Sequence, residues 1–219
     1  MMFFDSSTLI SMAMTCSLPI LRKLKQSYDD DFFITDAVYG ETIGRAMQSL
    51  RFRYEGYRLK ELVEDGVIKV YSDKELQGQI KDLMDSINRT YFTNGRPLSI
   101  VQLGEMSATA ACLKEHANSI AVDERTTRLL IENPASLKPW LETKLHTDIT
   151  INEENQEKWL SLISKKFIPV RSAELATTAW EKGILGDNSD VLYGLLWALK
   201  FAGCAIAENE IDFYMKRVT

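Results

Sequence analysis

Five short apolar runs, separated by longer amphipathic stretches, limit what this chain can fold into. The runs are Phe3-Phe4, 32–34, 67–71, 119–122 and 167–170. Each is short enough for a buried strand, and helix-forming sequence follows each of them. Strands that alternate with helices favour a mainly parallel sheet with helices on both faces. We therefore expect an α/β protein with three layers, α/β/α.

The remaining elements can also be placed from the pattern. We expect helices over 8–26 (interrupted at Pro19), 36–64, 72–91, 99–117, 126–132, 172–182 and 189–202, a loop at 93–97 and a short terminal strand at 205–207. The pattern weakens over 134–166, where only a helix near 153–164 is indicated. The sequence thus predicts a single domain over 1–219, with a helical insertion at 134–166 and extra helices in its C-terminal half.

Composition excludes several classes of protein. A net charge of −5 argues against coating nucleic acid through bulk charge. The three cysteines, Cys16, Cys112 and Cys204, are far apart and form no C-x-x-C pair, so we expect buried free thiols in a reducing compartment. Two histidines supply few ligands for a His-rich metal site. We find no stretch that is long and apolar enough to span a membrane, and we expect a cytoplasmic protein.

Four acidic residues fall where the expected strands meet the helices that follow them. Asp5 and Asp123 each end an apolar run. Glu41 lies in the first turns of the helix after the second strand, and Glu105 lies near the start of a helix rich in small residues. Open α/β sheets bind ligands outside the carboxyl ends of their strands. We therefore expect these four side chains to share one edge of the sheet.

Acids that share an edge need a counter-charge. At ~4 Å and an effective dielectric constant of ~20, each like-charged pair costs about 4 kcal/mol. A divalent cation offsets this repulsion, and Mg²⁺ or Mn²⁺ suits a site that offers carboxylates and no His or Cys. Such an ion can activate water and stabilise charge on a phosphodiester. The pattern predicts a four-carboxylate metal site.

Each acid alone also has a simpler interpretation. Asp5 and Asp123 could be helix N-caps. Glu41 could pair with Arg45 four residues later on a helix surface. Glu105 could complement a helix dipole from the first turn. The coincidence of all four acids at one edge is what favours a shared site.

Basic residues near these acids could bind substrate. One group lies on the helix expected over 36–64, interleaved with aromatic residues: Arg45, Arg51, Arg53, Arg58 and Lys60. These side chains could contact phosphates while the aromatic rings stack on bases, or they could form a solvated helix face. Arg125 and Arg128 follow Asp123 closely and could bind a phosphate; surface ion pairs are the alternative.

Four segments of the chain, 5–10, 36–42, 103–108 and 121–125, resemble the signature blocks of PIN-domain proteins. The third block, Leu103-Gly104-Glu105-Met106-Ser107-Ala108, is closest to the VapC-type branch with a Gly-Glu-x-x-Ala block. The order and approximate spacing match over 1–132, and 167–203 resembles the closing strand and helix. The chain departs from the pattern in its insertion at 134–166, in the long stretch between the second and third blocks, and in Glu105, where many members have Asp.

The resemblance implies a three-layer α/β/α fold and a Mg²⁺- or Mn²⁺-dependent nuclease, most often an endoribonuclease acting on RNA. It implies metal ligands at Asp5, Glu41, Glu105 and Asp123, and a supporting hydroxyl from Ser6 or Ser7. Arg45, Arg125 and Arg128 are the expected substrate contacts. An antitoxin-like protein partner and a homodimer are consistent with the family. The alternative is a catalytically inactive RNA- or protein-binding regulatory module on the same fold.

Overall fold

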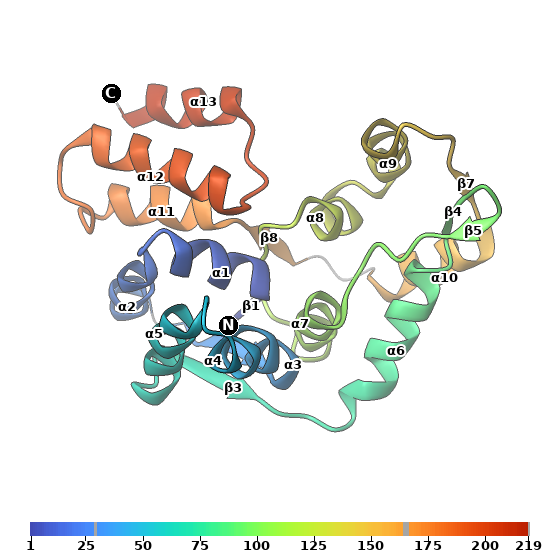
Figure 1. Cartoon of the computed structure of the whole chain (residues 1–219), viewed down its shortest axis with the longest axis horizontal. Coiled ribbons are helices and arrows are strands. Elements are labelled where there is room, and N and C mark those ends of the chain that lie inside the picture. Colours follow the sequence, from blue (N-terminus) through green and yellow to red (C-terminus); the bar gives the residue numbers. More distant parts are fainter. Residues whose placement is uncertain (29, 164–166, 219) are drawn as a thin grey trace.

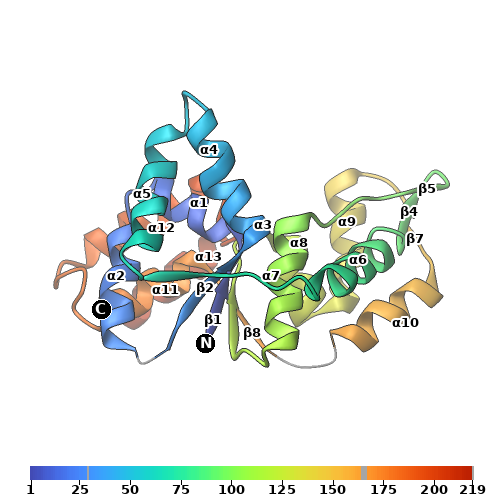
Figure 2. The same ribbon diagram turned by 90° about the horizontal axis from the view of Figure 1, so that it is seen from below.

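The computed structural model describes residues 1–28, 30–163 and 167–218, and its centre is a five-stranded parallel sheet. The strands lie in the order β3 (Ile68–Tyr71), β2 (Phe32–Thr35), β1 (Met2–Phe4), β6 (Ser119–Ala121) and β8 (Ile168–Val170). Every neighbouring pair is parallel, and Phe3 of the central strand lies opposite Phe33 and Ile120. Figures 1 and 2 show helices on both sides of this sheet. The expected α/β/α fold is confirmed.

Two hydrophobic cores lie on the two faces of the sheet. One core packs against α1 (Ser6–Met14), α2 (Leu18–Ser27), α5 (Arg53–Glu64), α11 (Ser172–Glu181) and α12 (Ser189–Ala202). The other packs against α6 (Leu76–Ile87), α7 (Leu103–Lys114), α8 (Arg125–Glu132), α9 (Leu137–Leu145) and α10 (Glu153–Leu162). The sheet is therefore the shared wall between two packed layers of helices.

The central strand shows why its sequence is apolar without alternation. Phe3 and Phe4 are both fully buried, but successive side chains of a strand point to opposite faces. Phe4 meets Phe32 edge to face at 5.3 Å in one core, while Phe3 stacks on Phe33 at 5.4 Å in the other. A strand buried on both faces needs apolar residues at every position.

The expected continuous helix over 36–64 is wrong. The chain instead forms α3 (Asp36–Tyr39), a π-helical turn η1 (Gly40–Gly44) and α4 (Arg45–Gln48), and it then breaks before α5. Ser49 is extended, with φ −92° and ψ 130°, and α5 folds back along α4. A Cβ on Gly56 would lie 2.8 Å from the Cβ of Ala46, so a glycine permits this close contact. Of the basic residues expected on one helix, Arg45 lies on α4 and Arg51 lies in the turn before α5. The others, Arg53, Arg58 and Lys60, lie on α5.

The C-terminal end also differs from expectation. The predicted strand at 205–207 is wrong: Ala205 donates its N–H to the carbonyl of Asp123, and its carbonyl accepts from Arg171. This segment crosses the carboxyl ends of β6 and β8 and leads into an unpredicted helix, α13 (Glu208–Val218). That helix begins with acidic and ends with basic residues, which is the charge order that a helix dipole favours.

The stretch expected as a helical insertion contains η2 (Pro134–Ser136), α9, β7 (Thr150–Ile151) and α10. Its strand pairs antiparallel with β4 (Tyr91–Thr93), which also pairs with β5 (Arg96–Pro97). The expected loop at 93–97 is thus a tight hairpin, and both residues of its turn, Asn94 and Gly95, have positive φ. Figure 1 shows this second sheet far from the central one. Residues 164–166 of the expected insertion lie outside the described residues.

The three cysteines are free, as expected from their spacing. The expected burial is confirmed for Cys112 and Cys204 but is wrong for Cys16, which is exposed. Burial raises the pKa of the Cys204 thiol to about 12, so this thiol stays protonated at neutral pH. Separately, none of the helices in the described ranges is long and apolar enough to cross a membrane.

Replacing Phe3 by Ala tests how much the packing of the central strand contributes to stability. We expect Phe3→Ala to lower the free energy of unfolding by about 3–5 kcal/mol, because the truncation leaves a cavity beside Phe33 and Tyr71. Urea denaturation measures the change. The control Phe213→Ala, whose ring is 57% exposed on α13, should change it by about 0.5 kcal/mol or less. Equal losses in the two variants would contradict this packing.

Candidate functional site

The order of the strands defines a switch point in the sheet. The chain proceeds from β1 through β2 to β3 on one side, and then returns to β6 and β8 on the other side of β1. Open α/β sheets bind ligands in the crevice outside the carboxyl ends of the strands at such a point. Asp5 follows β1 directly, and Asp123 lies two residues after β6. The structure thus brings these two acids to the edge where the sequence placed them.

Asp5 is fully buried at this edge. Its backbone N–H donates to the carbonyl of Ala121 at 2.8 Å, and its Oδ2 accepts from the N–H and the hydroxyl of Ser7 at 3.0 and 2.5 Å. The N-cap interpretation is therefore correct for Asp5. Burial raises the pKa of this carboxyl, and the charge of Glu41 adds to the rise although the bonds from Ser7 oppose it.

Glu41 faces Asp5 from the π-helical turn η1. The Ser6 hydroxyl donates to Oε2 of Glu41 at 2.9 Å and lies 3.3 Å from Oδ1 of Asp5, so one hydroxyl joins the two carboxylates. Glu41 also lies against the first turn of α7, where a Cβ on Gly104 would be 2.3 Å from Oε2. Only a glycine at this position leaves room for the carboxylate as placed.

The alternative role for Glu41, an ion pair with Arg45, does not form among the described residues. The π-helical turn gives a reason. The backbone N–H of Arg45 bonds to the carbonyl of Gly40, five residues back, so the four-residue register of an α-helix is lost at this point. Arg45 is exposed at the start of α4.

Glu105 is the third residue of α7 and completes a capping box with Gln102, whose N–H lies 3.1 Å from Oε2. The expected first-turn position is confirmed. Burial raises the pKa of Glu105 to about 8, and the negative charges of Asp5 and Glu124 add to the rise. Glu105 therefore belongs to the same electrostatic cluster as Asp5, and it carries a proton for much of the time near neutral pH.

Asp123 is in a different situation, because both of its carboxylate oxygens are already held. Oδ1 accepts from the Ser172 N–H at 2.7 Å and from the Thr8 hydroxyl at 3.3 Å, and Oδ2 accepts from the Ser172 hydroxyl at 2.7 Å. These bonds fasten the end of β6 to the first turns of α1 and α11. The N-cap interpretation is wrong for Asp123, since the cap of α8 is Glu124.

The sequence analysis gave no role to three residues that contact the acids at this edge: Gly104, Glu124 and Ser172. Glu124 accepts from the Thr127 N–H at 2.8 Å and raises the pKa of Glu105. Its position next to Asp123 in the sequence could have indicated that it lies at the same edge of the sheet. The signal for Ser172 was its place at the start of a helix behind the last apolar run, comparable with that of Ser6.

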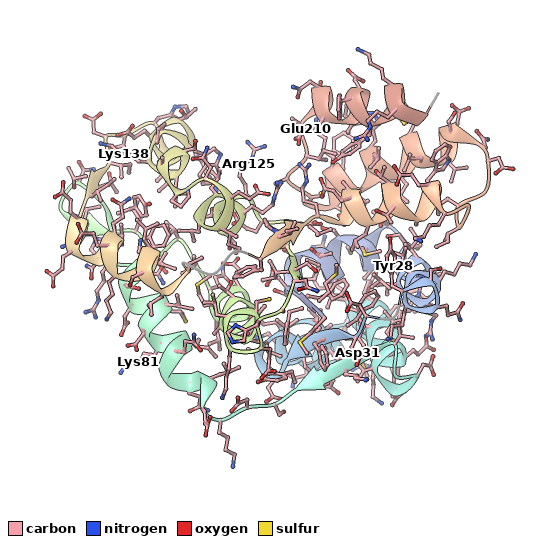
Figure 3. The ribbon with its side chains drawn as sticks, turned by 180° about the vertical axis from the view of Figure 1, so that it is seen from behind. Tyr28, Asp31, Lys81, Arg125, Lys138 and Glu210 are labelled. Atoms are coloured by element: carbon pink, nitrogen blue, oxygen red, sulfur yellow. The ribbon has the colours of Figure 1, made fainter. Side chains whose placement is uncertain are left out.

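The expected substrate-binding arginines lie on both sides of the acids. Arg125 is exposed at the start of α8, and Figure 3 shows it on the side of α8 that faces α13, which carries Glu210. Arg128 binds both oxygens of Glu132 at 2.9 Å, so the surface ion pair expected as its alternative role is present. Arg45 lies at the opposite side, beside Glu41.

The donor set suits a hard divalent cation in chemistry but is not arranged as a closed metal site. Within the described residues, no Lys, Arg or His lies within 4.0 Å of the carboxylates of Asp5, Glu41 and Glu105. In the same ranges, no group of three or more His, Cys, Asp or Glu is placed so that it could hold a metal ion as it stands. The carboxylates of Asp5, Glu41 and Glu105 would have to move closer together to meet on one ion.

Comparison with protein-family models, with curated proteins and with solved structures found no match to this chain. Its function is therefore inferred from the site and from the four sequence blocks that resemble PIN domains.

Asp123→Asn tests the structural role of Asp123. We expect the free energy of unfolding to fall by about 1–3 kcal/mol, because the amide turns an N–H donor toward the donors of Ser172. Urea denaturation measures the change, with Asp212→Asn on the exposed face of α13 as the matched control. Unchanged stability in Asp123→Asn would show that the bonds from Ser172 do not support the fold.

Glu105 should make stability depend on pH. Because its pKa is raised from 4.5 to about 8 in the folded chain, the folded state keeps a proton that the unfolded state releases. The free energy of unfolding should therefore fall as the pH rises from about 4.5 to about 8. We expect Glu105→Gln to flatten this decline in urea titrations with EDTA present. A decline that is equally steep in the variant would contradict the assignment.

Proposed function

We propose that this chain is a PIN-type nuclease that uses Mg²⁺ or Mn²⁺ to hydrolyse phosphodiester bonds in RNA. The observation that carries the proposal is the convergence of Asp5, Glu41 and Glu105 at the switch point of the sheet. They come from three separate segments, the N-cap of α1 after β1, the turn η1 and the helix α7, and in the described residues no basic side chain pairs with them.

Electrostatics supports a cation at this position. Uncompensated carboxylates must bind either protons or cations, and the raised pKa values of Asp5 and Glu105 express that need. The glycine at 104 leaves room for the Glu41 carboxylate at the start of α7, the helix that carries Glu105. A protein that binds no cation at this edge would be free of the repulsion if any one of these acids were a neutral residue.

The proposed ligands are Asp5, Glu41 and Glu105. Asp123, which was also expected to bind metal, is proposed as a positioning residue because its oxygens are held by Ser172 and Thr8. Ser6 takes the role of supporting hydroxyl for Asp5 and Glu41, and Ser7 fixes Asp5. When bound, the ion would activate a water molecule and stabilise charge on the phosphate.

The substrate class follows from the resemblance to PIN domains and from the surrounding cations. Arg45 and Arg125 are exposed on opposite sides of the acids, so a strand that crosses the cluster would meet a cation before and after it. Arg128 would first have to leave Glu132. The antitoxin-like partner, the homodimer and the cytoplasmic location stay predictions.

One observation favours the second candidate function, a catalytically inactive RNA- or protein-binding module. Asp123 is fully engaged in the fold, and the other acids would have to rearrange before an ion could bind. A module of this kind would keep the sheet edge and its cations without turnover.

Cleavage of labelled single-stranded RNA in Mn²⁺, Mg²⁺ or EDTA tests the proposal. We expect metal-dependent cleavage that Asp5→Asn reduces by more than about a hundredfold, beyond the 10–100-fold losses typical of changes outside a ligand set. The exposed control Asp212→Asn should retain full activity.

Cleavage in EDTA, or full activity of Asp5→Asn, would contradict the proposal. If neither protein cuts, Mn²⁺ binding measured on the same two samples decides between the candidates. Binding that Asp5→Asn abolishes would keep the metal site and point to a different substrate. No binding to either protein would favour the inactive module.

A further inference from the structure

The outward face of α12 is apolar. This helix packs against α1, α11 and α13, and Figure 1 shows it between α11 and α13. Its inner residues Leu192, Leu196 and Leu199 are fully buried. The other side of the helix is hardly more polar, because Lys200 is the only charged residue in the sequence between 191 and 201. A helix that is hydrophobic all round is normally buried all round. The composition of α12 therefore indicates that a partner covers its outward face.

Phe201 projects from this face near the C-terminal end of the helix. It is 82% exposed, but its position is fixed, because its ring stacks on Trp197 at 5.8 Å between the ring centres. Trp197 in turn meets Tyr193 edge to face at 6.3 Å. A side chain that is already held loses less conformational entropy when a partner covers it. Phe201 is thus a preformed apolar anchor.

An open cavity lies near the other end of the same face. It has a volume of about 270 Å³ and is lined by Val191 and Leu195 of α12, by Ile184 and Leu185, and by the turn between α1 and α2. A cavity of about 150 Å³ is large enough to bind benzene, so this one can receive the ring of a phenylalanine. One helix therefore carries an apolar anchor near one end and an apolar cavity near the other.

The middle of the face lets another helix come close. Gly194 and Ala198 lie there, one helical turn apart, and both are exposed. A Cβ on Gly194 would meet nothing within 4 Å, so the space above this residue is open. The side chains at a contact set the distance between two packed helices, and these two positions keep that distance short.

We infer that the outward face of α12 binds the same face of a second copy of this chain. The two helices run antiparallel about a two-fold axis, and Phe201 of each copy enters the cavity of the other. Such an axis brings the C-terminal end of one helix to the N-terminal end of its partner, so both anchors and both cavities are filled at once. The axis passes near residue 196, which is midway between 191 and 201.

The charges along the face favour a second copy over RNA or an anionic membrane. Lys200 is already paired with Glu208 at 2.9 Å, and Asp190 is exposed in the first turn of the helix. RNA and anionic lipids are attracted by clusters of uncompensated cations. In the antiparallel pair, by contrast, Asp190 of one copy lies near the end of the helix that carries Lys200 in the other.

This dimer does not depend on the proposed nuclease activity. The sequence suggested a homodimer without assigning a surface to it, and α12 supplies one. Dimerisation can be measured whether or not the protein cuts RNA.

Sedimentation equilibrium over a range of protein concentrations tests the pairing. We expect a reversible equilibrium between monomer and dimer for the unaltered chain. Gly194→Arg should be monomeric, because the long side chain keeps the two helices apart, and it should fold normally because the space above residue 194 is open. The matched control Gly78→Arg, at an exposed position of α6 with the same open space, should still dimerise.

The anchor can be tested separately. Phe201→Ser should weaken dimerisation by on the order of tenfold or more, because a buried aromatic anchor contributes much of the affinity of an interface. Phe213→Ser, at an exposed position of α13, should leave dimerisation unchanged. Circular dichroism spectra and urea denaturation confirm that the variants are folded.

A disulfide across the two-fold axis tests how the helices are arranged. Ala198 is close to the expected axis, so a thiol there lies near its own counterpart in the other copy. We expect Ala198→Cys, in a chain that also carries Cys16→Ser to remove the exposed native thiol, to form a disulfide-linked dimer on mild oxidation. Gly78→Cys in the same background should stay unlinked on a non-reducing gel.

A monomer at every concentration, a dimer that survives Gly194→Arg, or no link through position 198 would overturn the inference. Binding of liposomes or RNA by a monomeric protein through Phe201 would also overturn it, and would assign the face to that ligand.

Discussion

The two hydrogen bonds of the Ser7 hydroxyl hold the candidate site together. It donates to Oδ2 of Asp5 at 2.5 Å and accepts from the backbone N–H of Asp123 at 3.0 Å, so it links the residues that follow β1 and β6. The N–H of Asp5 bonds to the carbonyl of Ala121 beside it. Neighbouring parallel strands could diverge beyond their last paired residues. The bonds of Ser7 keep the two segments of the chain together there and hold a buried carboxylate at the switch point.

The acids on the two sides of Ser7 are of two kinds. On the side of Asp123, both oxygens receive hydrogen bonds from neutral donors of α1 and α11, and the acid serves the fold. On the side of Asp5, the carboxylate meets Glu41 and Glu105, and like charge together with burial raises the pKa values of Asp5 and Glu105. Two acids at one edge of the sheet thus differ in role because their partners differ. Asp123 is held by hydrogen-bond donors, whereas Asp5 faces other carboxylates.

The sequence was sufficient for features that depend on local pattern. Doubly buried strands such as Phe3-Phe4 predict the parallel sheet, and the parallel sheet predicts that Asp5 and Asp123 meet at one edge. Features set by tertiary contact were missed. The close packing of α5 on α4 needs the glycine at 56 beside Ala46, and the engagement of Asp123 depends on Ser172, 49 residues later in the chain.

Helix α9, from the stretch expected as an insertion, contributes to the surroundings of the acids. Glu105 and Glu124 line a second cavity, of about 290 Å³, together with Leu141 and Lys144 of α9. Burial is the largest cause of the raised pKa of Glu105, and α9 forms part of the wall that buries it. Acids of the cluster therefore line two cavities: Glu41 lines one with residues of α4 and α5, and Glu105 lines one with residues of α9. In the proposed nuclease, a substrate that reaches Asp5 would have to fit both walls, so α9 would contribute to its recognition as much as the sheet edge does.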